Sequence, residues 1–542
     1  MVTMNLLLIT ILLPLIGAAA IWTWGEEGRG QARWVALTTS LLTLLLAGRV
    51  VFTYPDGIEP LEFDWLGAGS SGLDIRLSIG LDGLSLWLFG LSALLTVVSV
   101  LVSWEAIQDR AAGFYGLLLL LETGMLGVFA ARDIILFYIF FEFTLIPLFF
   151  LIGIWGSEER RYAAMKFFLF TLAGSVLTFL GLLAIVLWAY YHPVAPGATV
   201  LTFSIAALRD SLAATPIDPT LQVWIFVALF AGFAIKVPLF PLHTWLPLAH
   251  VEAPTAGSVI LAGILLKIGT YGFLRFSIPM LPDATATCMP WMLWLAAVGI
   301  IYGALVALAQ SDIKRLIAYS SVSHLGFCML GLFALNTPGL EGGVLQTINH
   351  GLSTGGLFAL VGMIYERYHT REIKDLSGIA RRTPWLAMFM LLMTFSSIGL
   401  PGLNGFAGEF LLLLGMFQRA WTESGWLEIQ YKTIAVLGVL GVVLGAWYML
   451  WLVERVFFGL LREPPHGADE PPVRDMTLRE VAAMGLIAVF VFWIGLRPEF
   501  FLERIRPAVR ELSAPAVFAL SEQQEQQMAG GADTRGDISR AD

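Results

Sequence analysis

Charged residues are scarce in this sequence. Asp, Glu, Lys and Arg together make up 13% of its 542 residues, whereas a soluble domain needs roughly a quarter of its residues charged to cover its surface. Hydrophobic residues make up 57% of the chain, and the mean hydropathy is +0.78. A surface built from this composition must face lipid over most of its area, which excludes an ordinary soluble protein.

Cysteine is nearly absent, and basic residues are in the minority. Only Cys288 and Cys328 occur, they form no C-x-x-C pair, and the seven histidines show no H-x-x-x-H spacing. Iron–sulfur clusters generally need four cysteine ligands, and structural zinc sites need four Cys or His ligands. We therefore expect no metal and no redox cofactor in this chain. The net charge of −9 argues against a nucleic-acid partner, which would require clustered basic residues.

The N-terminus lacks the positive segment that begins a secretory signal peptide. No Lys or Arg precedes Arg29, and such a segment is part of the signal-peptide pattern. The apolar run at 5–24 is also long enough to cross a bilayer. We interpret it as a retained first transmembrane helix.

Long apolar runs are abundant. Windows of about 20 apolar residues, the length that crosses a bilayer, recur fourteen times along the chain. They lie at 5–24, 34–52, 84–104, 114–131, 134–155, 165–190, 221–241, 254–277, 290–309, 316–335, 344–365, 386–418, 433–453 and 480–496. Because the linkers are short, we predict an all-α polytopic membrane protein of about fourteen transmembrane helices, with no appended soluble domain.

Basic residues gather in alternate loops. One set of loops holds most of them, including Arg29, Arg110, Lys314 and Arg479, while the longest loop of the other set is acidic. Loops rich in Lys and Arg stay cytoplasmic, so we expect the N-terminus outside. Segment 500–520 is expected to form a surface helix on the outer side. The acidic, small-residue end from Gln523 onward is expected to be a disordered tail.

Ionisable residues interrupt several spans, where they are energetically expensive and usually functional. Glu142 lies about eight residues into the fifth span, or roughly 12 Å deep at 1.5 Å per residue, near the centre of a core about 30 Å thick. Five more residues lie at similar depth: Lys236, Lys267, His324, His350 and Glu409. Packed helices could align all six, so we predict a proton-translocation path along them.

These six residues also have structural interpretations. Glu142 and Lys236 could form a static salt bridge, and Lys267 could extend its amine toward the membrane surface. Each histidine could simply hydrogen-bond a neighbouring helix. Alignment at one depth beside interrupted helices favours the proton path.

Four further ionisable residues are possible accessory sites. Glu122 in the fourth span could be a neutral hydrogen-bonding acid, and Lys166 near the start of the sixth span could reach the cytoplasmic surface. His243 and His250, near the loop between the seventh and eighth spans, fit either a gate or entry role or plain loop packing.

Proline and glycine interrupt the seventh and twelfth spans, each beside an ionisable residue. The seventh runs into KVPLFPLHTWLP, and the twelfth contains GLPGLNGFAGEF. Such paired interruptions indicate inverted repeats around a midplane pathway. We therefore expect spans four to eight and nine to thirteen to form two inverted five-helix repeats. The expected units are 1–113 (first three helices), 114–277 and 290–458 (repeats), and 480–542 (last span, surface helix and tail).

A G-x-G-x-x-G match, GAGSSG at 67–72, does not predict dinucleotide binding. That fingerprint has meaning only between a strand and a helix of a βαβ unit. This copy is expected in an acidic loop before the third span.

Five segments resemble one known family over nearly the whole chain. They are GLDGLSLWLFGLSALLTVV, FYIFFEFTLIPLFFLIGIWG, AIKVPLFPLHTWLPLAHVEAPTAGSVILAGILLKIGTYG, AYSSVSHLGF and GLPGLNGFAGEF, with the basic loop TREIKDLSGIARR also fitting. They are similar to the M subunits of bacterial NADH-quinone oxidoreductase (respiratory complex I), antiporter-like proteins homologous to the mitochondrially encoded chain 4. The H-T-W-L-P-x-A-H run is highly specific to antiporter-like proteins.

The resemblance implies roles for the matching residues. Glu142 and Lys236 match an ion pair that modulates the pump, and Lys267 matches the central proton carrier. His324 and His350 match relay positions, and Glu409 matches the exit residue. Glu at this last position is typical of M subunits, whereas the sister L and N subunits and Mrp relatives usually have Lys.

The resemblance also implies partners and a location. The partners would be other complex I subunits, especially the neighbouring L and N subunits, with FMN, Fe–S clusters and quinone in or at those partners. The location would be the bacterial inner (plasma) membrane. Three alternatives stay open: a subunit of a Mrp-type sodium/proton antiporter, a subunit of a ferredoxin-dependent or hydrogenase relative of complex I, and a stand-alone transporter of a small solute.

Overall fold

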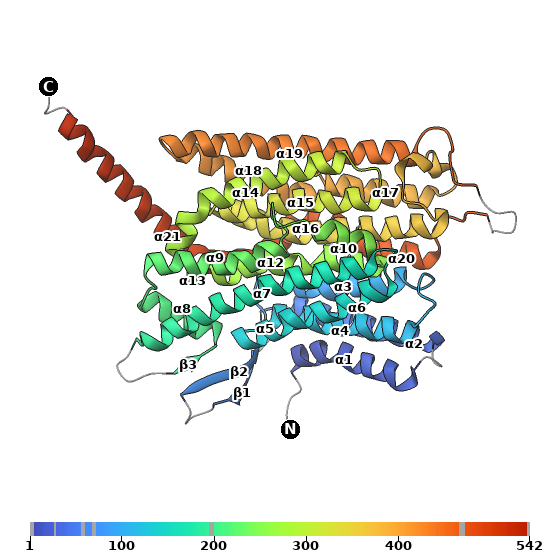
Figure 1. Cartoon of the computed structure of the whole chain (residues 1–542), viewed down its shortest axis with the longest axis horizontal. Coiled ribbons are helices and arrows are strands. Elements are labelled where there is room, and N and C mark those ends of the chain that lie inside the picture. Colours follow the sequence, from blue (N-terminus) through green and yellow to red (C-terminus); the bar gives the residue numbers. More distant parts are fainter. Residues whose placement is uncertain are drawn as a thin grey trace.

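The computed structural model describes residues 5–25, 29–55, 60–67, 72–194, 200–465 and 472–538, and the chain forms a bundle of long helices lying side by side (Figure 1). The helices up to the middle of the chain are α1 (Leu6–Trp24), α2 (Arg29–Thr53), α3 (Leu86–Val102), α4 (Ala111–Ala130), α5 (Ile134–Phe143), α6 (Leu145–Trp155), α7 (Arg160–Tyr191), α8 (Ile205–Ala214), α9 (Pro219–Lys236), α10 (Leu246–Glu252), α11 (Thr255–Ile260), α12 (Lys267–Gly272) and α13 (Ile278–Met280). The remaining helices are α14 (Pro282–Leu308), α15 (Ile313–Phe333), α16 (Thr337–Tyr368), α17 (Pro384–Ser397), α18 (Asn404–Thr422), α19 (Trp426–Phe457), α20 (Leu478–Leu496) and α21 (Pro498–Ile538).

Every predicted apolar window coincides with helix. In the described part of the chain, eleven segments are long and apolar enough to cross a membrane. The other three windows fall on α3, which has 17 residues, on α16, and on the pair α17 and α18. The all-α membrane fold is therefore confirmed, and the count of fourteen crossings stays a prediction.

Polar residues at the helix starts explain several boundaries. The Asp133 carboxylate accepts hydrogen bonds from the backbone N–H groups of Ile135 and Leu136 and so caps α5. Asp218 caps α9, whose first residue is Pro219. Thr477 and Glu480 form a reciprocal capping box at α20. Each cap satisfies backbone donors that have no partner inside the helix.

Both predicted interruptions are present. The seventh span ends as a helix at Lys236 and resumes as α10 at Leu246. The twelfth is divided into α17 and α18, with Gly399 at φ 72° and Gly402 at φ 91° between them. These positive φ angles are strained for any residue with a Cβ atom, so the glycines permit the break.

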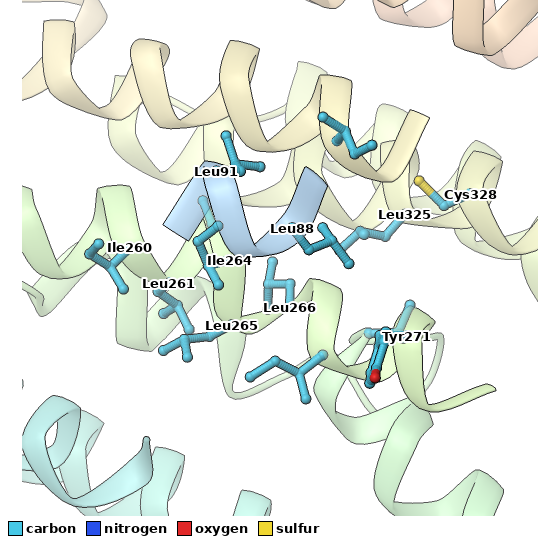
Figure 2. Packing of buried hydrophobic residues seen from close by; sticks show 14 of the residues in the cluster. Leu88, Leu91, Ile260, Leu261, Ile264, Leu265, Leu266, Tyr271, Leu325 and Cys328 are labelled. Atoms are coloured by element: carbon cyan, nitrogen blue, oxygen red, sulfur yellow. The ribbon is translucent and has the colours of Figure 1, made fainter. Parts of the chain in front are cut away.

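The eighth span contains two π-helical turns that the sequence analysis missed. They are η2 (Leu261–Leu265) and η3 (Phe273–Ser277), on either side of α12. The segment Thr255–Met280 is buried inside the protein except for Thr255 and Arg275, which are partly buried. Figure 2 shows Leu88 and Leu91 of α3 facing Ile264 of this segment in the apolar core.

The acidic loop before the third span is a β-hairpin, which the sequence analysis also missed. Strands β1 (Leu61–Leu66) and β2 (Leu73–Ile79) pair antiparallel, and β3 (Leu201–Thr202) pairs parallel with β2. The G-x-G-x-x-G match joins β1 to β2, and its residues 68–71 lie outside the described residues. Because antiparallel neighbours flank it, the match is not part of a βαβ unit.

The hairpin is followed by a loop that a partly buried ion pair anchors. The Asp82 carboxylate lies 2.6 Å from the Arg275 guanidinium of η3. Burial by itself raises the pKa of the Asp82 carboxyl, but the charge of Arg275 and hydrogen bonds from Ser85 outweigh it and hold the pKa below its usual value.

The C-terminal segment is longer than expected. Helix α21 contains the predicted surface helix at 500–520 and is continuous to Ile538, and the disordered tail from Gln523 stays a prediction. Residues such as Ala, Gln and Glu have high helix propensity, and extending an existing helix costs far less than nucleating one. The far end of α21 projects away from the bundle (Figure 1).

Candidate functional site

Lys267 lies at the centre of the buried site. It is the first residue of α12, directly after the π turn η2, and is fully buried. Its ammonium group donates a hydrogen bond to the carbonyl oxygen of Ala262. Its Nζ also lies 2.7 Å from Nδ1 of His350 on α16. A buried amine is therefore in direct hydrogen-bond contact with an imidazole from a helix distant in the sequence.

The contacts continue from His350 toward Glu409. The rings of His350 and His324 have centroids 5.7 Å apart. His324 Nδ1 lies 3.4 Å from Glu409 Oε1, and the side-chain amide of Gln346 donates a hydrogen bond of 3.0 Å to the same oxygen. The structure therefore brings together Lys267, His350, His324 and Glu409 in one row, which we call the central row.

Neutral polar side chains surround the Glu409 end of the central row. Asn349 donates to the carbonyl oxygen of Asn404 over 2.7 Å, and Ser396 donates to the Asn404 side chain over 2.6 Å. A Cβ atom on Gly408 would lie 2.5 Å from Gln346 Oε1, so glycine is required for this close approach of α16 and α18. Together these contacts fix the start of α18 against α16 and α17.

The sequence analysis did not identify these supporting residues. Gln346, Asn349 and Asn404 are at most 2% exposed, and each is an uncharged polar residue in an apolar stretch. Uncharged polar residues in an apolar stretch indicate buried hydrogen bonds, because a buried polar group without a partner is costly. This indication is weaker than the signal from a charged residue.

Glu142 and Lys236 lie apart from the central row. Lys236 is the last residue of α9, is buried, and has its Nζ 4.6 Å from the ring centroid of Phe141. Glu142, the next residue after Phe141, is partly exposed, and its Oε1 atom is buried without a hydrogen-bond partner. No ion pair within 4.0 Å joins these two described side chains. Lys236 faces the Phe141 ring rather than forming a closed salt bridge with Glu142.

The accessory candidates are scattered. Glu122 on α4 is fully buried, and neither carboxylate oxygen has a partner. Lys166 on α7 is partly exposed. His250 stacks on Phe358 with ring centroids 4.4 Å apart, and neither ring nitrogen has a hydrogen-bond partner. Among the described residues, none of these side chains forms a hydrogen bond or an ion pair with a member of the central row.

His243 belongs to an aromatic cluster at the interrupted seventh span. Its ring centroid lies 5.9 Å from Phe240 and 5.1 Å from Tyr302 of α14. Its Nδ1 atom is buried without a hydrogen-bond partner. The cluster thus joins the break in the seventh span to helix α14.

A large polar cavity opens where α7 begins and α16 ends. Its volume is about 1280 Å³, and charged residues of both signs line it, including Glu105, Arg160, Lys314 and Arg371. The Lys314 ammonium donates hydrogen bonds to the carbonyl oxygens at the end of α10, next to the turn of chain that carries His250. The cavity therefore admits water to the end of the bundle that carries basic loops.

In the part of the chain that the structure describes, no three His, Cys, Asp or Glu side chains form a group that could hold a metal ion. The chemistry of the central row is instead that of acids and bases. An amine, two imidazoles and a carboxylate in sequence can each accept and release a proton.

Comparison with known proteins agrees with this description. A family described as NADH:quinone oxidoreductase/Mrp antiporter, TM, matches residues 131–445. NADH-quinone oxidoreductase subunit M of Rhodobacter capsulatus is 41% identical, over 94% of this chain and 96% of the relative. The Escherichia coli K12 subunit M is 38% identical, over 92% and 96%.

Solved structures agree as well. A chain in the structure of respiratory complex I from Thermus thermophilus with bound NADH has a TM-score of 0.82 and 33% identity, over 94% of this chain and 99% of that one. A chain of the Mrp complex from Dietzia sp. DQ12-45-1b has a TM-score of 0.78 at 21% identity, over 98% of this chain and 60% of that one, which shows a shared fold. The chain therefore belongs to the NADH:quinone oxidoreductase/Mrp antiporter family of membrane proteins, as a homologue of the M subunits.

Proposed function

We propose that this chain is the M subunit of the membrane arm of a bacterial NADH:quinone oxidoreductase and translocates protons. The single observation that carries the proposal is the central row, in which Lys267 contacts His350, and His324 contacts Glu409, inside a membrane-spanning bundle. An ionisable group in such a place is energetically expensive, and groups kept there despite the cost usually serve transport. Four in succession supply a path along which protons can pass.

The energy must come from outside this chain. Moving one elementary charge across 100 mV costs about 2.3 kcal/mol. In the proposed complex, partner subunits carry FMN and Fe–S clusters and reduce quinone, and the neighbouring L and N subunits contact this one. The chain itself supplies residues that bind, hold and release protons.

In the proposed mechanism, Glu142 and Lys236 act as the input. Lys236 lies next to Phe141, and the Glu142 carboxylate has an oxygen without a partner. Movement in a neighbouring subunit would change the separation of the two charges. Because an opposite charge nearby stabilises a protonated amine, closing the pair would retain the proton on Lys236 and opening it would release the proton toward Lys267.

The path would cross the protein in the plane of the membrane. The inverted repeats at 114–277 and 290–458 would each contribute a half, with Lys267 in the first and His324, His350 and Glu409 in the second. The expected orientation, with the basic loops cytoplasmic and the N-terminus outside, would make the 1280 Å³ cavity the cytoplasmic entrance.

The decisive test replaces Lys267 by Met in the assembled complex, reconstituted into liposomes. We expect NADH:quinone turnover and proton pumping to fall at least tenfold, because Met cannot carry a proton. The matched control is Lys374→Met in an exposed loop, which should retain full activity. Wild-type pumping by Lys267→Met would refute the proposal, and pumping that requires sodium would favour the Mrp-type alternative.

A further inference from the structure

The side of His324 that faces away from Glu409 is also occupied. Its Nε2 atom lies 3.1 Å from the Ser397 hydroxyl oxygen and 3.3 Å from the Tyr448 hydroxyl oxygen. Ser397 is the last residue of α17, just before the break, and Tyr448 is on α19. Both side chains are buried, so two further helices hold the imidazole.

Hydroxyl groups suit a ring that gains and loses a proton. A Ser or Tyr hydroxyl can donate one hydrogen bond and can also accept one. When His324 is neutral with its proton on Nδ1, facing Glu409, either hydroxyl can donate to Nε2. When His324 is doubly protonated, Nε2–H can donate to either hydroxyl oxygen. The ring therefore keeps a partner in both protonation states.

His350 lacks such a partner in the described structure. Its Nδ1 is occupied by Lys267, whereas its Nε2 is buried with no hydrogen-bond partner. A buried polar atom without a partner carries the full cost of its lost hydration. Of the two histidines of the central row, His324 is thus the one whose surroundings suit both the neutral and the charged ring.

A small cavity lies beside the two hydroxyls. Its volume is about 10 Å³, and His324, Ser397, Glu409 and Tyr448 line it. That volume is about the minimum for one water molecule, which also needs two to four polar partners. The four lining side chains supply them, and Gly445, which also lines the cavity, would place a Cβ atom no closer than 3.8 Å to the Tyr448 hydroxyl.

We propose that Ser397 and Tyr448 are positioning residues that hold the His324 ring toward Glu409 and stabilise it with either one or two protons. The proposal rests on the proposed function and assigns these two hydroxyls a part in it. The other titratable groups around His324 are Glu409 from α18 and His350 from α16, with Lys267 of α12 behind His350. From α14, the Ile300 carbonyl oxygen accepts a hydrogen bond from Ser323.

The test uses the whole complex in liposomes with the double substitution Ser397→Ala, Tyr448→Phe. Both changes remove only hydroxyl groups. We expect NADH:quinone turnover coupled to pumping to fall about tenfold or more, since the charged ring loses both hydrogen-bond partners of its Nε2 atom. Each single substitution should have a smaller effect, because one hydroxyl remains.

Tyr431→Phe is the matched control. Tyr431 is on the same helix α19, is equally buried, and its hydroxyl has no hydrogen-bond partner. Turnover is normalised to NADH oxidation by an artificial electron acceptor, which reports the amount of assembled enzyme independently of pumping. A structural defect would lower both rates together, whereas loss of the positioning role lowers only the coupled one.

The outcomes separate this inference from the function on which it rests. If Lys267→Met is inactive but the double variant is fully active, the positioning role is refuted and the proposed function stands. If both variants pump at the wild-type rate, the proposed function itself fails. If Tyr431→Phe loses as much coupled activity as the double variant, the effect belongs to α19 packing and the inference is overturned.

Discussion

The two halves of the bundle treat their buried ionisable groups differently. In the second half, His324 has Glu409 on one side and two hydroxyls on the other, and Gln346 holds the carboxylate. In the first half, Glu122 and His250 are buried with no partner for any side-chain polar atom. The surroundings of His324 and Glu409 form a closed network, although Nε2 of His350 has no partner, whereas the first half contains isolated groups.

The difference indicates which half of the bundle can change when its surroundings change. A satisfied polar network is rigid, because breaking any member leaves a buried group without a partner. An isolated buried group gains free energy when water or a neighbouring chain supplies a hydrogen bond. Under the proposed function, we therefore expect the first half to respond to its surroundings and the second half to pass on a proton through a fixed geometry.

The largest expected effect is a difference in proton pumping between substitutions of two carboxylates in the first half, Glu142 and Glu122. In the assembled complex, Glu142→Gln should lower proton pumping about tenfold or more, because removing its charge cancels its attraction for Lys236, at about 1.4 kcal/mol per tenfold. Glu122→Gln is the matched control, since Glu122 is buried with no partner, and it should change pumping less than about twofold. Wild-type rate and stoichiometry in Glu142→Gln would exclude the input role.

A second prediction breaks the closed network. Gln346→Leu should slow coupled turnover by about threefold to tenfold, because Glu409 loses one hydrogen bond, and a typical hydrogen bond is worth about 0.5–1.5 kcal/mol net. Thr347→Val on the same helix is the control, since the Thr347 hydroxyl donates only to the Gly343 carbonyl oxygen one turn away. Equal losses in the two variants would mean that α16 packing, and not Gln346, is responsible.

The smallest expected effect concerns the ion pairs that attach α21 to the two halves of the bundle. Arg506 of α21 donates hydrogen bonds to the buried Glu341 of α16, and Glu511 pairs with Arg209 of α8 at 2.5 Å. Arg506→Ala should destabilise the docked α21 by about 2–3 kcal/mol, toward the lower end of the cost of leaving a buried charge unpaired. Glu511→Ala breaks an exposed pair and should cost less than about 1 kcal/mol.

Hydrogen exchange of α21 in the intact complex measures both effects. Arg506→Ala, which breaks the contact with the second half, should lower the protection of α21 more than Glu511→Ala, which breaks the contact with the first half. The reason is that the contact with the second half is the more buried one. Equal protection in the two variants would show that apolar contacts, such as Trp87 against Phe501, dominate the docking.

The composition and local pattern determined the membrane class, the position of each long apolar helix and the two interruptions. These features depend on short stretches of chain: a run of apolar residues, a proline and glycines beside Glu409, an isolated charge in a span. The same locality explains the errors. The π-helical turns of the eighth span and the β-hairpin before the third span were missed, because neither has a local sign of this kind.

Only the tertiary structure decided which of the six predicted residues meet. Lys267 and His350 are 83 residues apart, and His324 reaches Glu409, Ser397 and Tyr448 from three other helices. Helices that are apolar on every side give little sign of which face turns inward, so depth in the membrane can be read from the sequence but rotation cannot. Rotation and packing place four ionisable groups in contact and keep Glu142 and Lys236 apart.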